Sequence, residues 1–187
     1  GGMPPVTGVA ARDITLADML TVQRTVAGIE SIAPVVAGNA PVSHGSRERD
    51  STVIGTSADF FAVRQLRIAQ GSMLPPLALD LATPVAVLGQ TLKHELFGNR
   101  RAIAQRVRLR EYRFRVIGVL EGRGDSFGMD LSEAIFIPVA SAQQVFDTNG
   151  LFRVVLKARE GTSTAQLKGA LLARMKEAKV SLPGGCA

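Results

Sequence analysis

Two periods of hydrophobic residues alternate along this chain, one typical of helices and one typical of strands. Apolar residues spaced three and four apart predict a first helix that begins after Thr15 and ends at Gly28. Thr15 and Asp18 match a capping box, in which two side chains bond the free backbone N–H groups at a helix start. The stripe expected to face the core consists of Leu16, Met19, Leu20, Gln23, Val26 and Ala27.

The rest of the chain interleaves helices and strands of uneven length. Helices are predicted over 57–61, 91–97, 141–146 and 163–176, the last capped by Ser163 with Gln166. Extended segments are predicted at 32–42, 51–55, 84–88, 105–118, 133–138 and 152–158, with Pro34 and Pro41 breaking the first. Residues 72–83 have no clean period and are predicted as a loop. This order favours an α+β fold over a doubly wound sheet.

Segment 105–118 adds a high density of arginine to its alternating pattern. Apolar residues occupy one predicted face, and the other face carries Arg106, Arg108, Arg110, Arg113 and Arg115. If Glu111 and Tyr112 form a two-residue turn, Arg110 lies opposite Arg113 and Arg108 lies opposite Arg115. Like charges directly opposite each other destabilise a strand pair, so such a ladder invites an acidic neighbour.

Two interpretations of this arginine ladder stay open at the level of sequence. The ladder is either a solvated strand face, neutralised by nearby carboxylates such as Glu111 and Glu121, or a contact for an anion or a partner. The net charge of +6 and the pI of 10.2 are compatible with nucleic acid, anionic lipid or an acidic protein as that partner. Nucleic-acid binding usually adds aromatic residues for stacking, and this chain has no Trp and one Tyr.

Composition sets further bounds. A chain of 187 residues with 46% apolar content can bury one substantial core or two small ones. No apolar run approaches the roughly 20 residues that cross a bilayer. Residues 1–5 and 183–187 are interpreted as added or cut ends. The one cysteine, Cys186, lies in the second of these ends, so neither a disulfide nor a cysteine metal site is expected.

Enzyme signatures are incomplete. Residues 124–128 match G-x-S-x-G, but no histidine follows His94 and the residues after Gly128 predict a loop and then a strand. Glycines 122, 124 and 128 miss the dinucleotide-binding spacing by one residue. His44 and His94 are far apart, and the acids near residue 130 lack the density of a calcium loop. The sequence therefore predicts no catalytic residue, no cofactor and no metal site.

Short motifs occur in an order that resembles the extracytoplasmic core domain of MacB-type permeases, ABC transporters whose family includes lipoprotein-releasing and FtsX-like proteins. In chain order the motifs are Gly55 with Phe60 and Phe61, Gly71, Val85–Gly89, Leu96–Gly98, Ile103 with Ala104, Val116–Val119, Gly128 with Asp130, and Ile135–Pro138. The resemblance covers about Thr15 to Met175. Ser72, Ala104 and Ser132 replace an arginine, a glycine and an aspartate of the family pattern, which affects local contacts more than the fold.

The resemblance implies two subdomains, one inserted in the other. A Porter-like subdomain would comprise residues 6–57 and 148–182, and a Sabre-like subdomain residues 58–147. A strand expected before Thr15 is weak or missing in the sequence, and one expected after Lys179 is cut short. These ends fit a domain excised from between transmembrane spans.

The family implies a non-catalytic domain outside the membrane. ATP hydrolysis in a cytoplasmic nucleotide-binding domain or subunit would move this periplasmic or extracytoplasmic domain through transmembrane helices of an inner-membrane permease. Its implied partners are a second permease copy, a periplasmic adaptor with an outer-membrane channel, and the exported substrate. The alternative function is a basic soluble module that binds nucleic acid or another polyanion.

The surfaces expected to contact a partner are the arginine ladder and the glycine-rich loop 122–132, because exposed loops on a rigid scaffold are common interaction sites. The residues nominated are Arg106, Arg108, Arg110, Arg113, Arg115, Arg123, Asp125 and Asp130.

Overall fold

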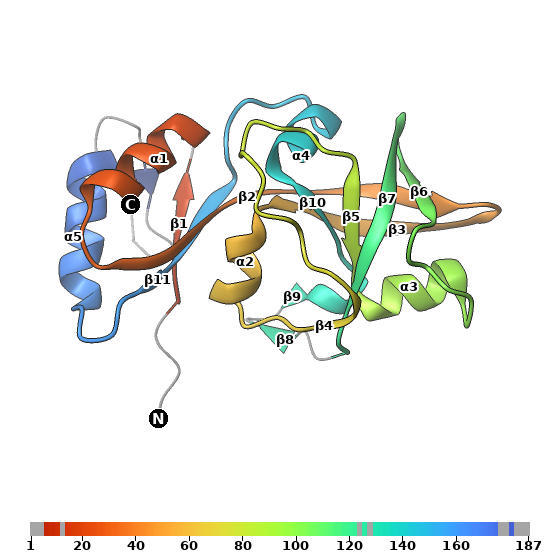
Figure 1. The fold of residues 1–187 in the computed structure, drawn as a ribbon. Helices are drawn as coiled ribbons and strands as arrows, with labels where there is room; N and C mark the ends of the chain where they lie inside the picture. Colours follow the sequence, from red (N-terminus) through yellow and green to blue (C-terminus); the bar gives the residue numbers. More distant parts are fainter. Residues whose placement is uncertain (1–5, 12–13, 123–124, 127–128, 176–179, 182–187) are drawn as a thin grey trace.

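The computed structural model describes residues 6–11, 14–122, 125–126, 129–175 and 180–181 (Figure 1). The helices are α1 (Leu16–Thr25), α2 (Ala58–Val63), α3 (Gln90–Phe97), α4 (Val139–Val145) and α5 (Thr164–Met175), with a short 3-10 turn at Leu131–Glu133. The strands are β1 (Val6–Ala11), β2 (Ile29–His44), β3 (Arg47–Thr56), β4 (Ile68–Gly71), β5 (Val85–Leu88), β6 (Arg106–Leu109), β7 (Tyr112–Leu120), β8 (Asp125–Ser126), β9 (Met129–Asp130), β10 (Ile135–Pro138), β11 (Arg153–Ala158) and β12 (Val180–Ser181).

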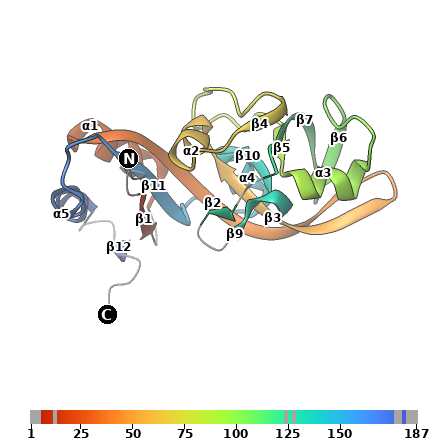
Figure 2. The same cartoon turned by 90° about the horizontal axis from the view of Figure 1, so that it is seen from below.

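One sheet runs through the whole molecule. Its strand order is β12-β1-β11-β2-β3-β10-β5-β7-β4, and β6 pairs with both β2 and β7. The 16-residue strand β2 joins the two ends, because its first half pairs with β11 and its second half with β3. Helices α1 and α5 lie with β1 and β11 at one end of the molecule, and α3, β6 and β7 lie at the other (Figures 1 and 2).

Six strands at the second end form a closed ring, in the order β2-β3-β10-β5-β7-β6 and back to β2. Alternating side chains such as Val42, Val107 and Leu109 are at most 1% exposed and belong to one core cluster. The same cluster includes Met19 and Val22 of α1 and Leu167 of α5. The ring and the α1–α5 end therefore share a continuous hydrophobic core.

A second core lies on the other face of the sheet, beneath α2. The rings of Phe60 and Phe61 lie 6.0 and 5.6 Å from the ring of Phe136 on β10. Ile54 of β3 and Val155 of β11 belong to the same cluster. The pair Phe60–Phe61, which contributed to the family motif, therefore fixes α2 on the sheet.

Most predicted elements are confirmed. The capping box at Thr15 and Asp18 is present, and Gly28 adopts φ +90° just after α1. Gly98 ends α3 with φ +60°, as expected. At the start of α5 the backbone N–H of Gln166 donates to Ser163 Oγ at 3.4 Å. Residues 72–83 form a loop with isolated turns.

Three expectations about elements were wrong, and one strand was missed. A strand does precede Thr15, since β1 pairs along β11 from Val6 to Ala10. Leu20 is 39% exposed, whereas Val22, outside the predicted stripe, is buried. Strand β4 was not predicted. The prolines Pro34 and Pro41 do not break β2, because each lies next to a point where β2 gains or loses a partner strand and a missing N–H there costs little.

Candidate functional site

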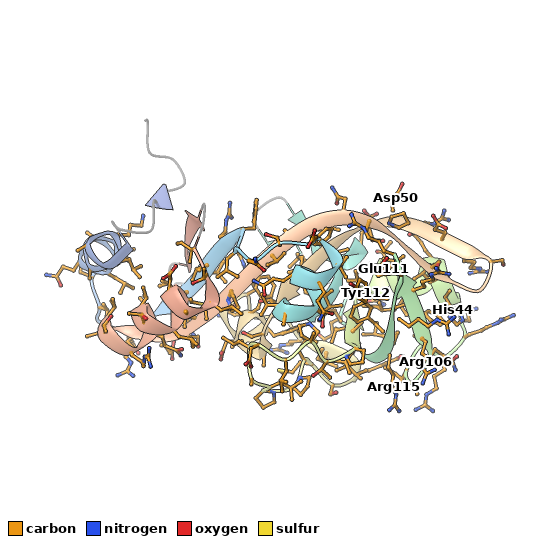
Figure 3. All side chains as sticks on the ribbon, turned by 90° about the horizontal axis from the view of Figure 1, so that it is seen from above. His44, Asp50, Arg106, Glu111, Tyr112 and Arg115 are labelled. Carbon is orange, nitrogen blue, oxygen red and sulfur yellow. The ribbon has the colours of Figure 1, made fainter. Side chains whose placement is uncertain are left out.

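The arginine ladder lies on the outer side of the strand ring. In the antiparallel pair of β6 and β7, Arg106 lies opposite Arg115 and Arg108 opposite Arg113. Their neighbours Val107 and Phe114 point inward and are buried. All four arginines are exposed. Figure 3 shows Arg106 and Arg115 side by side, with Asp50 at the opposite edge of the view.

The predicted register of this hairpin was wrong, because the two turn residues lie one position earlier in the chain than expected. Leu109 pairs with Tyr112, so Arg110 and Glu111 form the turn in place of Glu111 and Tyr112. Arg110 adopts φ +55° there. Both registers place arginine opposite arginine, because they keep the same side chains on the same face.

Arg110 leaves the ladder and binds helix α4. Its Nη1 donates to the carbonyl oxygen of Val145 at 2.7 Å, and its guanidinium carbon lies 5.1 Å from the centre of the Phe146 ring. A cation at the carboxyl end of a helix is also favoured by the helix dipole. The contacts of Arg110 are therefore those of an intramolecular anchor.

Neither expected carboxylate neutralises the ladder. Among the residues described, ion pairs within 4 Å join only Arg49 to Glu95 and Lys157 to Glu30. Glu111 instead interacts with Tyr112, whose pKa is raised by desolvation and then by the Glu111 charge and hydrogen bond. A third carboxylate, Glu48 of β3, is also too far away. Ser43 of β2 lies between Glu48 and Arg108, so the Glu48 carboxylate is two strands, or about 10 Å, from the ladder.

The neighbouring tip of the β2–β3 hairpin adds basic residues that the sequence did not connect with the ladder. His44 Nδ1 lies 2.9 Å from the carbonyl oxygen of Arg106, and its ring lies 4.2 Å from that of Phe97. Arg47 Nη1 donates to the Glu95 carbonyl at 3.3 Å. These contacts fix the tip against β6 and α3, so His44 is a structural residue. About sixty residues separate the two segments in sequence, and only the pairing of β2 with β6 brings them together.

The glycine-rich loop contains a two-stranded ribbon. Asp125 lies opposite Asp130 in the pairing of β8 and β9. Arg123 lies outside the described residues, as do Gly124 and Gly128. Ser126 is in a strand that pairs with a second strand, which is not the strand–turn–helix of a nucleophile elbow. The ribbon follows Leu120, about 17 Å along β7 from Arg115, so the two nominated surfaces are separate.

The described residues contain neither a metal-binding cluster nor a helix that could span a membrane. No group of three or more His, Cys, Asp or Glu side chains there could hold a metal ion. None of the helices described is long and apolar enough to cross a membrane.

Comparison with known proteins decides the family. Residues 2–174 match the model of the MacB-like periplasmic core domain. The chain belongs to this family. Members form the periplasmic or extracellular region of MacB-like ABC transporter permeases, and the recognition made from short motifs is confirmed.

Named relatives of this MacB-like domain are export proteins. The chain is 27% identical over 172 residues to the macrolide export ATP-binding/permease protein MacB of Bdellovibrio bacteriovorus, covering 91% of the chain and 26% of that protein. It is 29% identical over 164 residues to the pyoverdine export ATP-binding/permease protein PvdT of Pseudomonas aeruginosa, covering 87% and 25%. The chain thus spans about a quarter of the length of these relatives.

The α+β fold is confirmed by a solved structure. The periplasmic region of MacB from Actinobacillus actinomycetemcomitans superposes with a TM-score of 0.83, at 17% identity, over 95% of this chain and 87% of that one. At this identity the likeness concerns the fold alone.

Proposed function

We propose that this MacB-like domain transmits movement from the membrane part of an ABC export permease to a partner outside the cytoplasm. The observation that carries the proposal is strand β2, which pairs with β11 at one end of the molecule and with β3 and β6 at the other. One core cluster accompanies it through both ends. A domain built in this way moves as one body, because bending it would break a continuous sheet and a close-packed core.

The two ends of the domain have different surroundings in this proposal. Strands β1 and β12, the first and last strands described, pair with each other at the α1–α5 end (Figures 1 and 2). Transmembrane helices on both sides of the domain would connect at this end. The arginine ladder lies at the opposite end, away from the membrane that those helices cross.

The proposed subdomains are the Porter-like residues 6–57 with 148–182 and the Sabre-like residues 58–147. Strand β3 belongs to the first range, and its partner β10 belongs to the second. The sheet therefore crosses the proposed boundary, which supports movement of both subdomains together.

The proposed partners follow from the relatives. Both named relatives are ATP-binding/permease proteins, which supports an ATPase domain or subunit as the source of movement. A second permease copy, a periplasmic adaptor with an outer-membrane channel, and an exported substrate complete the assembly. This domain would itself carry out no chemistry.

Within that assembly, the arginine ladder is the proposed contact for an acidic surface of the adaptor. Four exposed guanidinium groups in two opposed pairs have no ion-pair partner among the described residues. An acidic partner would relieve their repulsion and would also be steered to this end of the molecule. The loop around Asp125 and Asp130 is a second candidate contact, by its position between strands of the scaffold.

Paired spin labels in the full-length permease test the transmission of movement. Glu48 at the hairpin tip and Lys168 on α5 are exposed at opposite ends, and each can be replaced by Cys once Cys186 and any cysteine elsewhere in the full-length permease are replaced by Ser. The Glu48–Lys168 distance should stay constant between ATP-bound and nucleotide-free states, while the distance between equivalent labels on two copies changes. A change within one domain would contradict transmission by a rigid body, and constant distances in both measurements would contradict movement itself.

A further inference from the structure

A cleft of about 210 Å³ opens where the two ends of the molecule meet. Its walls come from five separate segments: helix α1, strand β2, the turn from β3 into α2, the loop 74–81, and the start of α4. At about 30 Å³ per water molecule this volume corresponds to about seven waters. The cleft therefore has room for a small organic group.

Most of the wall is apolar. Leu74 is 2% exposed and holds the loop down, whereas Leu77 and Leu81 on the same loop are 38% and 51% exposed. Both exposed leucines line the cleft. Large aliphatic side chains left in water beside a concave surface are typical of a binding site.

The polar side chains of the cleft lie at the start of α2, apart from Gln23 on α1. Asp59 is the one ionisable side chain among the lining residues, and in the described part of the chain no cation lies within ion-pair distance of it. Desolvation raises the pKa of this carboxyl. Beside it, the Ser57 Oγ is buried and lacks a hydrogen-bond partner among the residues described. The hydroxyl of Thr56, by contrast, donates to the Pro34 carbonyl at 2.7 Å.

An exposed carboxylate thus lies beside an apolar wall, and it is the one charge among the lining residues. We infer that this cleft binds a small organic cation, with its protonated amine at Asp59 and its apolar body against Leu77 and Leu81. The ammonium would donate a charge-assisted hydrogen bond to the Asp59 carboxylate. Anionic molecules are disfavoured by the Asp59 charge, and neutral ones lack the ion pair.

This inference does not rest on the arginine ladder or on transmission of movement. The ladder is basic and repels cations, so the arginine ladder does not compete with the cleft for a cation. Failure of either proposal would leave the other standing.

The test is a titration of the ¹⁵N-labelled 187-residue chain with n-hexylamine, n-hexanol and hexanoate, followed by amide chemical shifts in NMR spectra. We expect hexylamine to shift the amides of Ser57, Ala58 and Leu77 and to bind about three- to fivefold more tightly than hexanol, the ratio for a partly exposed ion pair. Hexanoate should bind more weakly than either. Equal affinity for amine and alcohol, or shifts confined to other segments, would overturn the inference.

Two matched variants assign the effect to one carboxylate. Asp59→Asn should abolish the preference for hexylamine over hexanol. Asp80→Asn removes the same charge from an exposed residue of loop 74–81 that does not itself line the cleft, and should leave that preference unchanged. Loss of the preference in both variants would attribute it to general electrostatics, and retention in both would exclude Asp59.

Discussion

The hydroxyl side chains that precede helices α1 and α2 differ in whether they accept a capping hydrogen bond from the helix backbone. Thr15 Oγ1 accepts from the backbone N–H of Asp18 at 3.2 Å, and the Asp18 carboxylate accepts from the backbone N–H of Thr15 at 3.0 Å. Ser57 occupies the equivalent position of α2, but its hydroxyl makes no cap bond. The residue type alone does not decide whether a cap forms.

These two hydroxyls should respond differently to substitution. Thr15→Ala should lower the free energy of unfolding by about 1 kcal/mol, because it removes a cap. For a chain of this size the melting temperature falls by about 2–4 °C. Ser57→Ala should leave the melting temperature unchanged or raise it, because a buried hydroxyl without a partner stabilises nothing. Calorimetric unfolding of both variants checks this, and equal losses would show that Ser57 makes a stabilising bond.

Arginines of one hairpin also separate into two kinds. Arg110 binds α4, while Arg108 faces Arg113 across the ladder. Arg110→Met should cost about 1 kcal/mol, through loss of a charged hydrogen bond and a cation–π contact. Arg108→Met should change the free energy of unfolding by less than about 0.5 kcal/mol, because relief of repulsion offsets the loss of an exposed bond to the Arg110 carbonyl. Urea unfolding distinguishes the two, and a larger loss for Arg108 would contradict the assignment.

At the scale of elements, helix α4 lies directly on strand β3. A Cβ atom at Gly55 would collide with the Cβ of Ala142, and one at Gly38 would lie 2.6 Å from the Phe146 ring. Strand and helix can approach this closely only because β3 has a glycine at that point. Gly55 is part of the family motif, and its structural reason is the packing of α4.

Two glycine-to-alanine substitutions give a matched test of this packing. Gly55→Ala should destabilise the domain by about 1–3 kcal/mol, because the added methyl group overpacks the β3–α4 contact. Gly169 lies in α5 with open space around it, so Gly169→Ala should stabilise the domain by about 0.5–1 kcal/mol through helix propensity. Thermal unfolding measures both shifts, and a neutral Gly55→Ala would mean that α4 can move away at no cost.

At the scale of the whole molecule, the exposed arginine ladder and the first and last described strands lie at opposite ends. Strands β1 and β12 lie at one end, and the arginines of β6 and β7 lie at the other (Figures 1 and 2). The cleft beside α2 lies between them. A domain with this arrangement can be attached at one end and make contacts at the other.

Charge reversal at the far end tests the proposed adaptor contact. In the full-length permease, Arg108→Glu with Arg113→Glu should weaken adaptor binding at least about tenfold, mainly by slowing association at low salt. The melting temperature should change little, because both side chains are exposed. Arg24→Glu with Arg159→Glu makes the same charge change at exposed positions of the α1–α5 end and should leave binding intact. Equal effects of the two pairs would refute a specific contact, and salt-dependent DNA binding lost only in the first pair would favour the polyanion alternative.

The sequence by itself determined the local elements and the family. The capping box at Thr15, the buried run Val85–Leu88 and the alternation in β6 and β7 all depend on neighbours a few residues away, so periodicity and turn residues suffice to predict them. The order of short motifs added the family, and the α+β class followed from the succession of elements.

Only the tertiary structure decided which distant residues meet. The closure of the strand ring, the continuity of β2 past two prolines and the anchoring of Arg110 on α4 depend on pairings across tens of residues. The hairpin register also required the structure, because both turn positions keep the same side chains inside. The cleft joins five segments from α1 to α4, and no local pattern predicts such a juxtaposition, since it arises from packing between elements and not within them.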